Sequence, residues 1–312
     1  MVNILITGGA GNLGSSLACK LIENGSYNVI VIDNLITGNI GNLPIGFKNL
    51  TFLESNVNNY TQLSEIMRKR KFDYIFHYAA LVGVKRTLDN PMLVLEDIEG
   101  IKNVLALAKE TGVKRVFYSS SSEVYGEPVS LPQNENTTPL NCKLPYAIVK
   151  NVGEAFFRSY HKEYGLEYNI FRFFNTYGPN QSEDFVISKF IDAALQNKDI
   201  TIYGDGEQTR TFCYIDDNVE TVTRVFEESL YVNEVINVGN TVEISINELA
   251  STVISLTHSS SAIVHLPALK EGDMSRRQPD NSKMMKLMNR SLLGIEEGIK
   301  KILSIRYDIP PR

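Results

Sequence analysis

A glycine-rich turn lies between a short apolar run and an amphipathic stretch near the start of this chain. Residues 2–7 read VNILIT, and residues 8–14 read GGAGNLG. Gly8, Gly11 and Gly14 stand three apart, and glycine at such positions permits a tight turn and a close approach of the backbone to a pyrophosphate. A helix that begins here would offer its N–H groups to the phosphates. The pattern predicts a nucleotide-binding strand–turn–helix unit; the alternative is a glycine-rich turn without a ligand.

Further apolar runs of strand length alternate with helix-like stretches along the first half of the chain. Most of these runs are apolar on both faces, which is typical of a parallel sheet covered on both sides. Alternation of this kind predicts an α/β fold with a doubly wound parallel sheet, the Rossmann arrangement. The runs are residues 27–32, 49–53, 72–78, 113–120 and 167–173. One predicted helix covers residues 92–109, with Val94, Ile98, Ile101, Leu105 and Ala108 on a single face.

The pattern changes after about residue 175, where turns, short helices and loops predominate. We expect residues 1–175 to form the Rossmann domain, with 210–240 returning to it. Residues 176–209 and 241–312 would then form a smaller, mixed C-terminal domain that binds the substrate.

Net charge and cysteine content limit the classes of function of this chain. The net charge of −5 gives no electrostatic support for a nucleic-acid partner. The cysteines Cys19, Cys142 and Cys213 are scattered, so we expect neither a disulfide framework nor a metal site. The chain begins MVNILITGG, without a signal peptide or a long apolar span. We therefore expect a cytoplasmic protein that does not contact membranes.

An acidic residue ends the second predicted strand. A carboxylate at the position of Asp33 accepts hydrogen bonds from a ribose 2′-hydroxyl and repels a 2′-phosphate. Residues 34–47 contain no Lys or Arg that would attract such a phosphate. The sequence therefore favours NAD over NADP, although Asp33 could instead cap the turn that follows it.

Two residues of PYAIVK (145–150) suggest acid–base chemistry. Tyr146 and Lys150 are four apart, so on a helix both lie on one face. A nearby ammonium favours the phenolate and so lowers the tyrosine pKa from about 10. Tyr146 could then remove a proton from a hydroxyl while hydride leaves the same carbon. The alternative is a solvated pair on a helix surface.

A run of serines occupies the carboxyl end of the fifth predicted strand, in YSSSSEVYG (118–126). Doubly wound sheets bind their ligands at this edge, where the glycine turn also lies. A serine hydroxyl there could donate to a substrate oxygen or orient the tyrosine.

These motifs together resemble those of a known family. TGGAGNLG, HYAALVGV, SSSSEVYG, YAIVK, RFFNTYGP and GDGEQTRTF are similar to the motifs of the extended short-chain dehydrogenase/reductase family. Within it they resemble the NAD-dependent nucleotide-sugar epimerase/dehydratase branch, which includes UDP-sugar 4-epimerases and UDP-glucuronate decarboxylases. The resemblance covers nearly the whole chain and implies oxidation at C4 of a nucleoside-diphosphate sugar.

The resemblance also implies catalytic roles. Tyr146 would be the base, Lys150 its electrostatic partner and a ribose contact, and Ser121 the catalytic hydroxyl. Tyr125 would be structural or adjacent to the substrate. Glu123 would be either a second general acid/base or a carboxylate hydrogen-bonded within its loop.

Binding residues follow from the same resemblance. Asn56 stands where the family usually has Asp, and Lys270 stands where Arg is common. The implied cofactor contacts are Gly8, Gly11, Asn12, Leu13, Gly14, Asp33, Asn34, Asn56, Val57, Ala79, Ala80, Ser119, Tyr146 and Lys150. The implied substrate contacts are Ser121, Ser122, Asn175, Arg210, Asp273 and Arg276.

The net reaction is less constrained than the first step. The pair Ser122–Glu123 replaces the Asp–Glu of thymidine-linked 4,6-dehydratases, so that activity is disfavoured. VKRT (84–87) resembles a stretch of some UDP-sugar 4-epimerases, and we expect 4-epimerisation as the net outcome. The alternatives are a dehydrogenase that releases a 4-keto UDP- or GDP-linked hexose or heptose, and a nucleotide-sugar decarboxylase or dehydratase. A non-catalytic NAD-binding protein is the alternative from another class. By resemblance, helices at 92–109 and 146–164 would form a homodimer interface.

Overall fold

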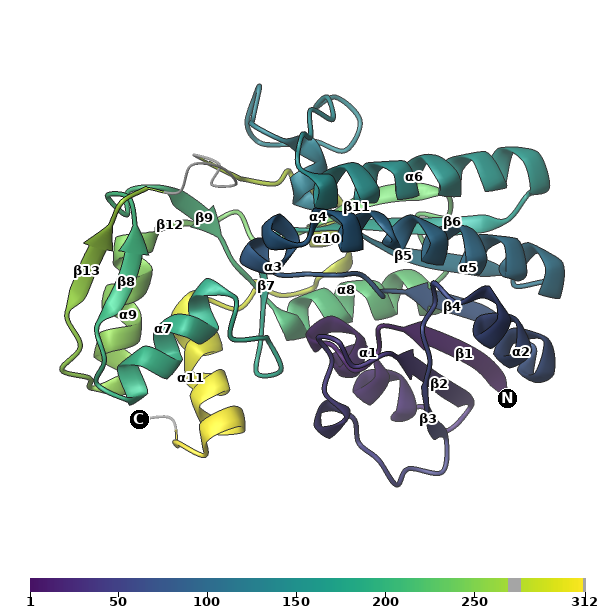
Figure 1. Ribbon diagram of the computed structural model, residues 1–312, viewed down its shortest axis with the longest axis horizontal. Helices are drawn as coiled ribbons and strands as arrows, with labels where there is room; N and C mark the ends of the chain where they lie inside the picture. The colour runs from purple at the N-terminus through teal and green to yellow at the C-terminus, as the bar shows by residue number, and fades with distance from the viewer. Residues whose placement is uncertain (269–275, 311–312) are drawn as a thin grey trace.

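A parallel sheet forms the centre of the larger part of the protein (Figure 1). The computed structural model describes residues 1–268 and 276–310. Its main sheet has seven strands in the order β11-β6-β5-β4-β1-β2-β3, and every neighbouring pair is parallel. The predicted doubly wound α/β fold is confirmed. The strands are β1 (Val2–Thr7), β2 (Tyr27–Asp33), β3 (Leu50–Glu54), β4 (Tyr74–His77), β5 (Arg115–Ser121), β6 (Glu167–Phe173) and β11 (Glu234–Val238).

Helices cover both faces of this sheet. Successive side chains of a strand point to opposite faces, so Ile4 and Ile6 of β1 join one hydrophobic core and Leu5 joins the other. Both cores are buried, which explains why the strands are apolar on both faces. The first core includes α1 (Asn12–Ile22) and α8 (Ile215–Glu227); the second includes α2 (Tyr60–Arg70), α5 (Asp97–Thr111) and α6 (Pro145–Tyr164).

The strand order reverses between β1 and β4, and a crevice for ligands forms at such a point, beyond the carboxyl ends of the strands. Thr7, the last residue of β1, joins the two segments that leave the sheet there. Its carbonyl accepts the Tyr78 N–H at 3.1 Å, and its hydroxyl accepts the Ala79 N–H at 3.2 Å. The turn after β1 and the segment after β4 therefore lie side by side.

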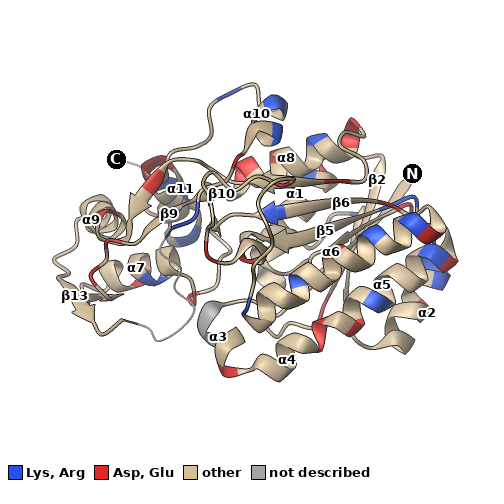
Figure 2. Cartoon of the chain, turned by 90° about the horizontal axis from the view of Figure 1, so that it is seen from above, with Lys and Arg blue, Asp and Glu red and all other residues tan. Residues whose placement is uncertain are grey.

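The single helix predicted over residues 92–109 is wrong, because the structure divides it into α4 (Pro91–Leu95) and α5. The hydrogen-bond ladder changes at Glu96, whose carbonyl accepts from the Glu99 N–H in an i,i+3 bond. The next residue, Asp97, accepts the Leu81 N–H at 2.8 Å and so anchors the start of α5 to the segment after β4. The two helices and α6 run side by side (Figure 2).

The smaller part of the protein lies beside the carboxyl edge of the sheet, at the left of Figure 1. Two-stranded sheets pair β10 with β7, β12 with β9, and β13 with β8.

No helix among residues 1–268 and 276–310 is long and apolar enough to cross a membrane. The remaining elements are η1 (Ile40–Asn42), α3 (Val84–Asp89), η2 (Ser122–Tyr125), β7 (Thr176–Tyr177), α7 (Val186–Leu195), β8 (Ile200–Tyr203), β9 (Thr209–Thr211), β10 (Cys213–Tyr214), β12 (Glu243–Ser245), α9 (Ile246–Thr257), β13 (Ile263–Leu266), α10 (Ser282–Leu287) and α11 (Ile295–Tyr307).

We predict that Gly14→Ala destabilises the cofactor-free protein, because a Cβ there would lie 2.5 Å from the Gly8 carbonyl oxygen. This contact is with backbone, so the turn itself must shift, at a cost of about 1–3 kcal/mol. Gly25→Ala is the matched control, since no atom lies within 4 Å of its Cβ position, and it should change stability by less than about 0.5 kcal/mol. Urea unfolding measures both; equal stability of the two variants would contradict the prediction.

Candidate active site

The glycine turn has the geometry of a dinucleotide-binding turn. Gly8 has a φ of +66°, and a Cβ on it would lie 2.5 Å from the Ala79 nitrogen. Gly11 precedes α1 without a side-chain cap, so the first-turn N–H groups of Asn12, Leu13 and Gly14 face a site that suits phosphate oxygens. These residues therefore fit the pyrophosphate of NAD.

Asp33 fixes the shape of this turn. One carboxylate oxygen accepts the Ala10 N–H at 3.0 Å, and the other accepts the Leu35 N–H at 2.8 Å. The capping role that we considered for Asp33 is therefore present. Each oxygen keeps a second lone pair for a ribose hydroxyl, so the cap does not compete with the binding role. Asn34 lies beside it and accepts the Ile36 N–H.

The residues expected near adenine and along the dinucleotide lie at the edge of the same crevice. Asn56 is partly buried on the segment after β3 and accepts the Asn58 N–H at 2.9 Å. Val57 is buried, and its carbonyl accepts from the Asn103 side chain at 3.0 Å. Ala79 and Ala80 are partly buried in the segment beside Gly8. All four contacts remain proposals.

Tyr146 and Lys150 lie in the first turns of α6, which begins at Pro145. The Lys150 ammonium lies 5.7 Å from the centre of the Tyr146 ring and 5.1 Å from that of Tyr118. It is 3% exposed and donates to the Ser119 carbonyl at 2.7 Å. The pair is therefore within the protein, beside the serine stretch, and not on a solvated helix surface.

The four serines end up in different surroundings. Ser119 and Ser120 are buried, and the Ser120 hydroxyl donates to Glu154 at 2.7 Å. Ser121 is partly exposed, caps the short helix η2 and lies close enough to Tyr146 to oppose the rise of its pKa. Ser122, an expected substrate contact, is only 2% exposed. Ser121 is thus the serine placed to share a substrate oxygen with the tyrosine.

Glu123 forms a partly buried ion pair that the sequence did not predict. Its carboxylate lies 2.7 Å from the guanidinium of Arg277, and the two side chains are 18% and 7% exposed. Arg276, which we expected to contact substrate, instead pairs at 2.6 Å with Glu243 on β12 and is 49% exposed. Neighbouring residues of an extended segment point in opposite directions. The sequence could not decide which of the two arginines faces inward.

The electrostatics of the site differ from the expectation that Lys150 lowers the pKa of Tyr146. Burial raises the pKa of Tyr146 above its ordinary value, the charge of Glu123 raises it further, and only the hydrogen bond with Ser121 and the charge of Arg277 oppose this. Burial lowers the pKa of Lys150 to about 8, although Asp97 acts in the opposite direction. In the cofactor-free protein, desolvation therefore outweighs the ammonium.

The two residues expected to contact the diphosphate lie next to β7 and on β9. Asn175 has a φ of +37° and donates to the Thr211 carbonyl at 2.8 Å. Arg210 on β9 is 9% exposed and donates to the Thr209 carbonyl at 2.8 Å. Both therefore line the β7–β9 region. Asp273 and Lys270 lie outside the described residues.

Comparison with known proteins agrees with this architecture. Residues 4–239 match the model of the NAD dependent epimerase/dehydratase family. A putative UDP-glucose 4-epimerase of Methanocaldococcus jannaschii is 36% identical over 307 residues, which covers 96% of this chain and 97% of that protein. A UDP-N-acetyl-alpha-D-glucosaminuronate decarboxylase of Bacillus cytotoxicus is 35% identical over 324 residues, 96% of each chain.

A solved structure supports the same assignment. The UDP-glucose 4-epimerase of Thermotoga maritima, determined with UDP-glucose, superimposes with a TM-score of 0.91 at 32% identity and covers 98% of this chain and 99% of that one. The match extends over both the main sheet and the smaller part. This chain is an enzyme of the NAD-dependent epimerase/dehydratase family.

Proposed function

We propose that this enzyme oxidises C4 of a nucleoside-diphosphate sugar and that 4-epimerisation is the net outcome. The observation that carries the proposal is the convergence of Tyr146, Ser121 and Lys150 beside the dinucleotide turn. NAD, when bound, accepts the hydride from C4. The similarity to UDP-glucose 4-epimerases supports a substrate of this class.

The protein residues would move the proton. Tyr146, in its phenolate form, takes the proton of the C4 hydroxyl. Ser121 donates a hydrogen bond to the same oxygen. Lys150, whose pKa is about 8, is mostly charged at pH 7 and stabilises the phenolate. Because the pKa of Tyr146 is raised, its phenolate is a strong base. Tyr146 therefore holds the proton from the C4 hydroxyl until the C4 oxygen takes it back.

The diphosphate and nucleoside would occupy the smaller part. We propose that Arg210 clamps the pyrophosphate, because a guanidinium fork matches paired oxygens, and that Asn175 lies beside it. We also propose the division into residues 1–175 with 210–240, and 176–209 with 241–312. The pairing of β11 with β6 supports the return of the chain to the first unit.

Decarboxylation is a second candidate, and the ion pair between Glu123 and Arg277 favours it. A guanidinium beside the reacting sugar can bind the C6 carboxylate of a uronate. After oxidation at C4 that carboxylate is β to a ketone, so the C5–C6 bond can break, carbon dioxide leaves, and the electron pair passes to the enolate. Glu123, as a second general acid/base, would return a proton to C5. The similarity to uronate decarboxylases supports this candidate.

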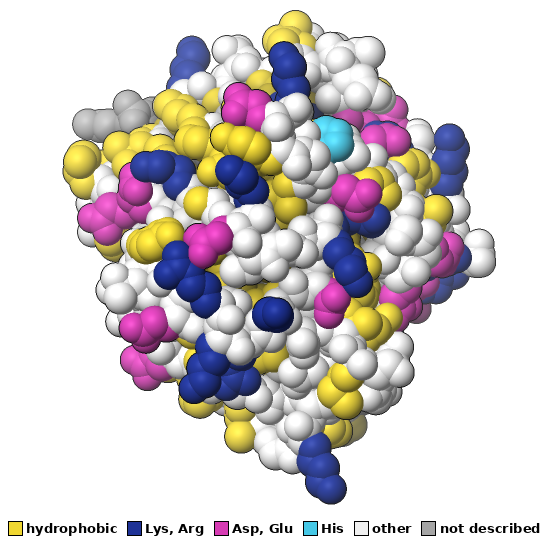
Figure 3. Space-filling model, turned by 90° about the vertical axis from the view of Figure 1, so that its right-hand side faces the viewer, with side chains coloured by type: hydrophobic (Ala, Val, Ile, Leu, Met, Phe, Trp, Pro, Cys, Tyr) yellow, Lys and Arg dark blue, Asp and Glu magenta, His cyan; other side chains and the backbone are white. Residues whose placement is uncertain are grey.

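We also propose a homodimer that forms through α4, α5 and α6 (Figure 2). Apolar side chains are exposed there, with Met92 at 73%, Ile148 at 39% and Tyr164 at 49%. A nucleic-acid partner is not proposed, because Lys and Arg are interspersed with Asp and Glu on the face in Figure 3 and the net charge is −5. The free, exposed thiol of Cys19 supports a reducing, cytoplasmic location.

We predict that Tyr146→Phe lowers the rate of C4 oxidation about 10²–10⁴-fold, because the proton acceptor is lost, while NAD binding is retained. Tyr125→Phe is the control and should cost far less. The NADH absorbance after addition of sugar nucleotide measures both, with NAD affinity measured by calorimetry. Equal losses would show that Tyr146 is not the base, and a wild type that gives neither an NADH band nor any product would indicate a pure NAD binder.

The mass of the product distinguishes the candidate reactions. With UDP- and GDP-linked hexoses, heptoses and uronates, we expect a product of unchanged mass and altered retention time by liquid chromatography–mass spectrometry. Loss of carbon dioxide would support the decarboxylase, and loss of water the dehydratase. Loss of two hydrogens would support a dehydrogenase that releases the 4-keto sugar. Any of these three would overturn epimerisation.

The dimer proposal is tested at the exposed apolar residues. We expect a dimeric mass by light scattering at micromolar concentration and a monomeric mass for Met92→Glu/Ile148→Glu, because an interface cannot bury unpaired carboxylates at low cost. Val242→Glu is the control, since Val242 is 70% exposed on the smaller part. A monomeric wild-type chain would refute the interface.

A further inference from the structure

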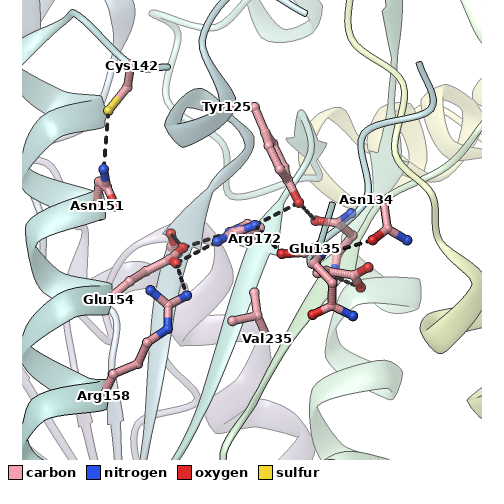
Figure 4. A network of polar contacts seen from close by, with 12 residues as sticks. Tyr125, Asn134, Glu135, Cys142, Asn151, Glu154, Arg158, Arg172 and Val235 are labelled. Carbon is pink, nitrogen blue, oxygen red and sulfur yellow. Dashed lines mark hydrogen bonds and ion pairs between the residues drawn. The ribbon is translucent and has the colours of Figure 1, made fainter. Parts of the chain in front are cut away.

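A buried ion pair joins helix α6 to strand β6 behind the serine stretch (Figure 4). Arg172 donates to both oxygens of Glu154, at 2.8 Å through Nε and 2.7 Å through Nη2. The two side chains are 1% and 0% exposed. Arg158 adds a contact of 2.9 Å from the exposed side of the helix. The proton-transfer scheme above assigns no task to this pair.

The pair holds the serine stretch at both ends. Ser120, opposite Arg172 in the β5–β6 register, donates to Glu154 at 2.7 Å. Arg172 donates through Nη1 to the hydroxyl of Tyr125 at 2.9 Å. The segment between these two contacts contains Ser121 and Glu123. Its position is therefore set by one glutamate and one arginine.

The same glutamate fixes the helix that carries the proposed base. Glu154 lies one helical turn beyond Lys150 and two turns beyond Tyr146, so the three residues share a face of α6. The position of the Tyr146 hydroxyl relative to Ser121 thus depends on contacts that pass through Glu154.

A chain of hydrogen bonds continues from Tyr125 toward the substrate side. Its hydroxyl donates to Asn237 at 2.7 Å, and the amide of Asn237 donates to the Asp280 carbonyl at 3.1 Å. Asp280 is close in sequence to Arg277, which pairs with Glu123. The contacts therefore form a closed ring around the segment that carries Ser121 and Glu123.

We propose that Glu154 and Arg172 are positioning residues that align Ser121 and Glu123 with Tyr146. This proposal rests on the proposed C4 oxidation. A buried ion pair adds little net stability compared with apolar side chains of similar volume. The two parallel N–H···O bonds of the pair instead fix the orientation of the two side chains. Misplacement of a catalytic group by about 1 Å can lower a reaction rate by about 100-fold.

The test replaces both charges together, as Glu154→Leu/Arg172→Met, so that no unpaired charge is left in the interior. The control is Arg115→Met/Glu167→Leu, which removes an ion pair between β5 and β6 at the other end of these strands. We expect both variants to melt near the wild type and to bind NAD normally. With the sugar nucleotide that gives the largest NADH band, kcat should fall about 100-fold in the first variant, KM should change little, and the control should match the wild type.

Wild-type kcat in a folded Glu154→Leu/Arg172→Met protein would overturn the proposal. If that variant does not fold, Ser120→Ala/Tyr125→Phe removes the two links and keeps the ion pair; it should lower kcat at least about tenfold, and an unchanged kcat would again overturn the proposal.

A readout without sugar separates this proposal from the proposed function. Carbon-13 NMR of ring-labelled tyrosine, assigned with Tyr146→Phe, reports the titration of Tyr146 in the NAD-bound protein. We expect its midpoint to differ between the wild type and the positioning variant. An identical titration overturns the positioning role even if the wild type oxidises no sugar, whereas a wild type that gives neither NADH nor any product overturns the proposed function alone.

Discussion

The nucleotide side of this enzyme depends on how closely the backbone segments after β1 and β4 approach each other. Thr7 controls this approach, since its hydroxyl accepts the N–H groups of Tyr78 and Ala79 and lies 2.8 Å from His77 Nδ1. Burial lowers the pKa of His77 to about 3, so the ring is neutral and Nδ1 can accept the hydroxyl proton. Gly8 has no Cβ and can therefore lie against Ala79. The crevice is thus formed mainly by backbone.

The catalytic side depends on charged groups within the protein. Helix α6 places Lys150 and Glu154 on its inner face, where an isolated charge would be costly. Burial alone would raise the pKa of Glu154, but the hydrogen bonds and charge of Arg172 lower it below the ordinary value. No carboxylate in the described ranges 1–268 and 276–310 forms an ion pair with Lys150, and burial lowers its pKa. Helix α6 therefore carries one carboxylate with a lowered pKa, that of Glu154, and one ammonium with a lowered pKa, that of Lys150.

The sequence predicted those features that depend on local pattern. The apolar runs located all six strands expected in the first half of the chain, and the run at 167–173 coincides with β6. The glycine spacing located the turn, and the Tyr146–Lys150 spacing located a pair on one helix face. Features that depend on distant partners were not predictable: the break at Glu96 reflects a bond between Asp97 and Leu81, and the inward direction of Arg277 reflects its contact with Glu123.

Hydrogen bonds also tie the segment around Arg277 to the edge of the main sheet. Gln133 donates from its backbone to the Gln278 carbonyl at 2.8 Å, and Asn237 on β11 contacts the Asp280 carbonyl. The segment around Arg277 is therefore anchored to the edge of the main sheet, whereas β9 with Arg210 is paired with β12. In the roles proposed above, Arg277 serves the sugar and Arg210 the diphosphate, and the two residues are attached to different sheets. Exchange of residues 241–268, which include β12, could therefore alter the support of Arg210 during evolution while the contacts between the Arg277 segment and the main sheet are kept.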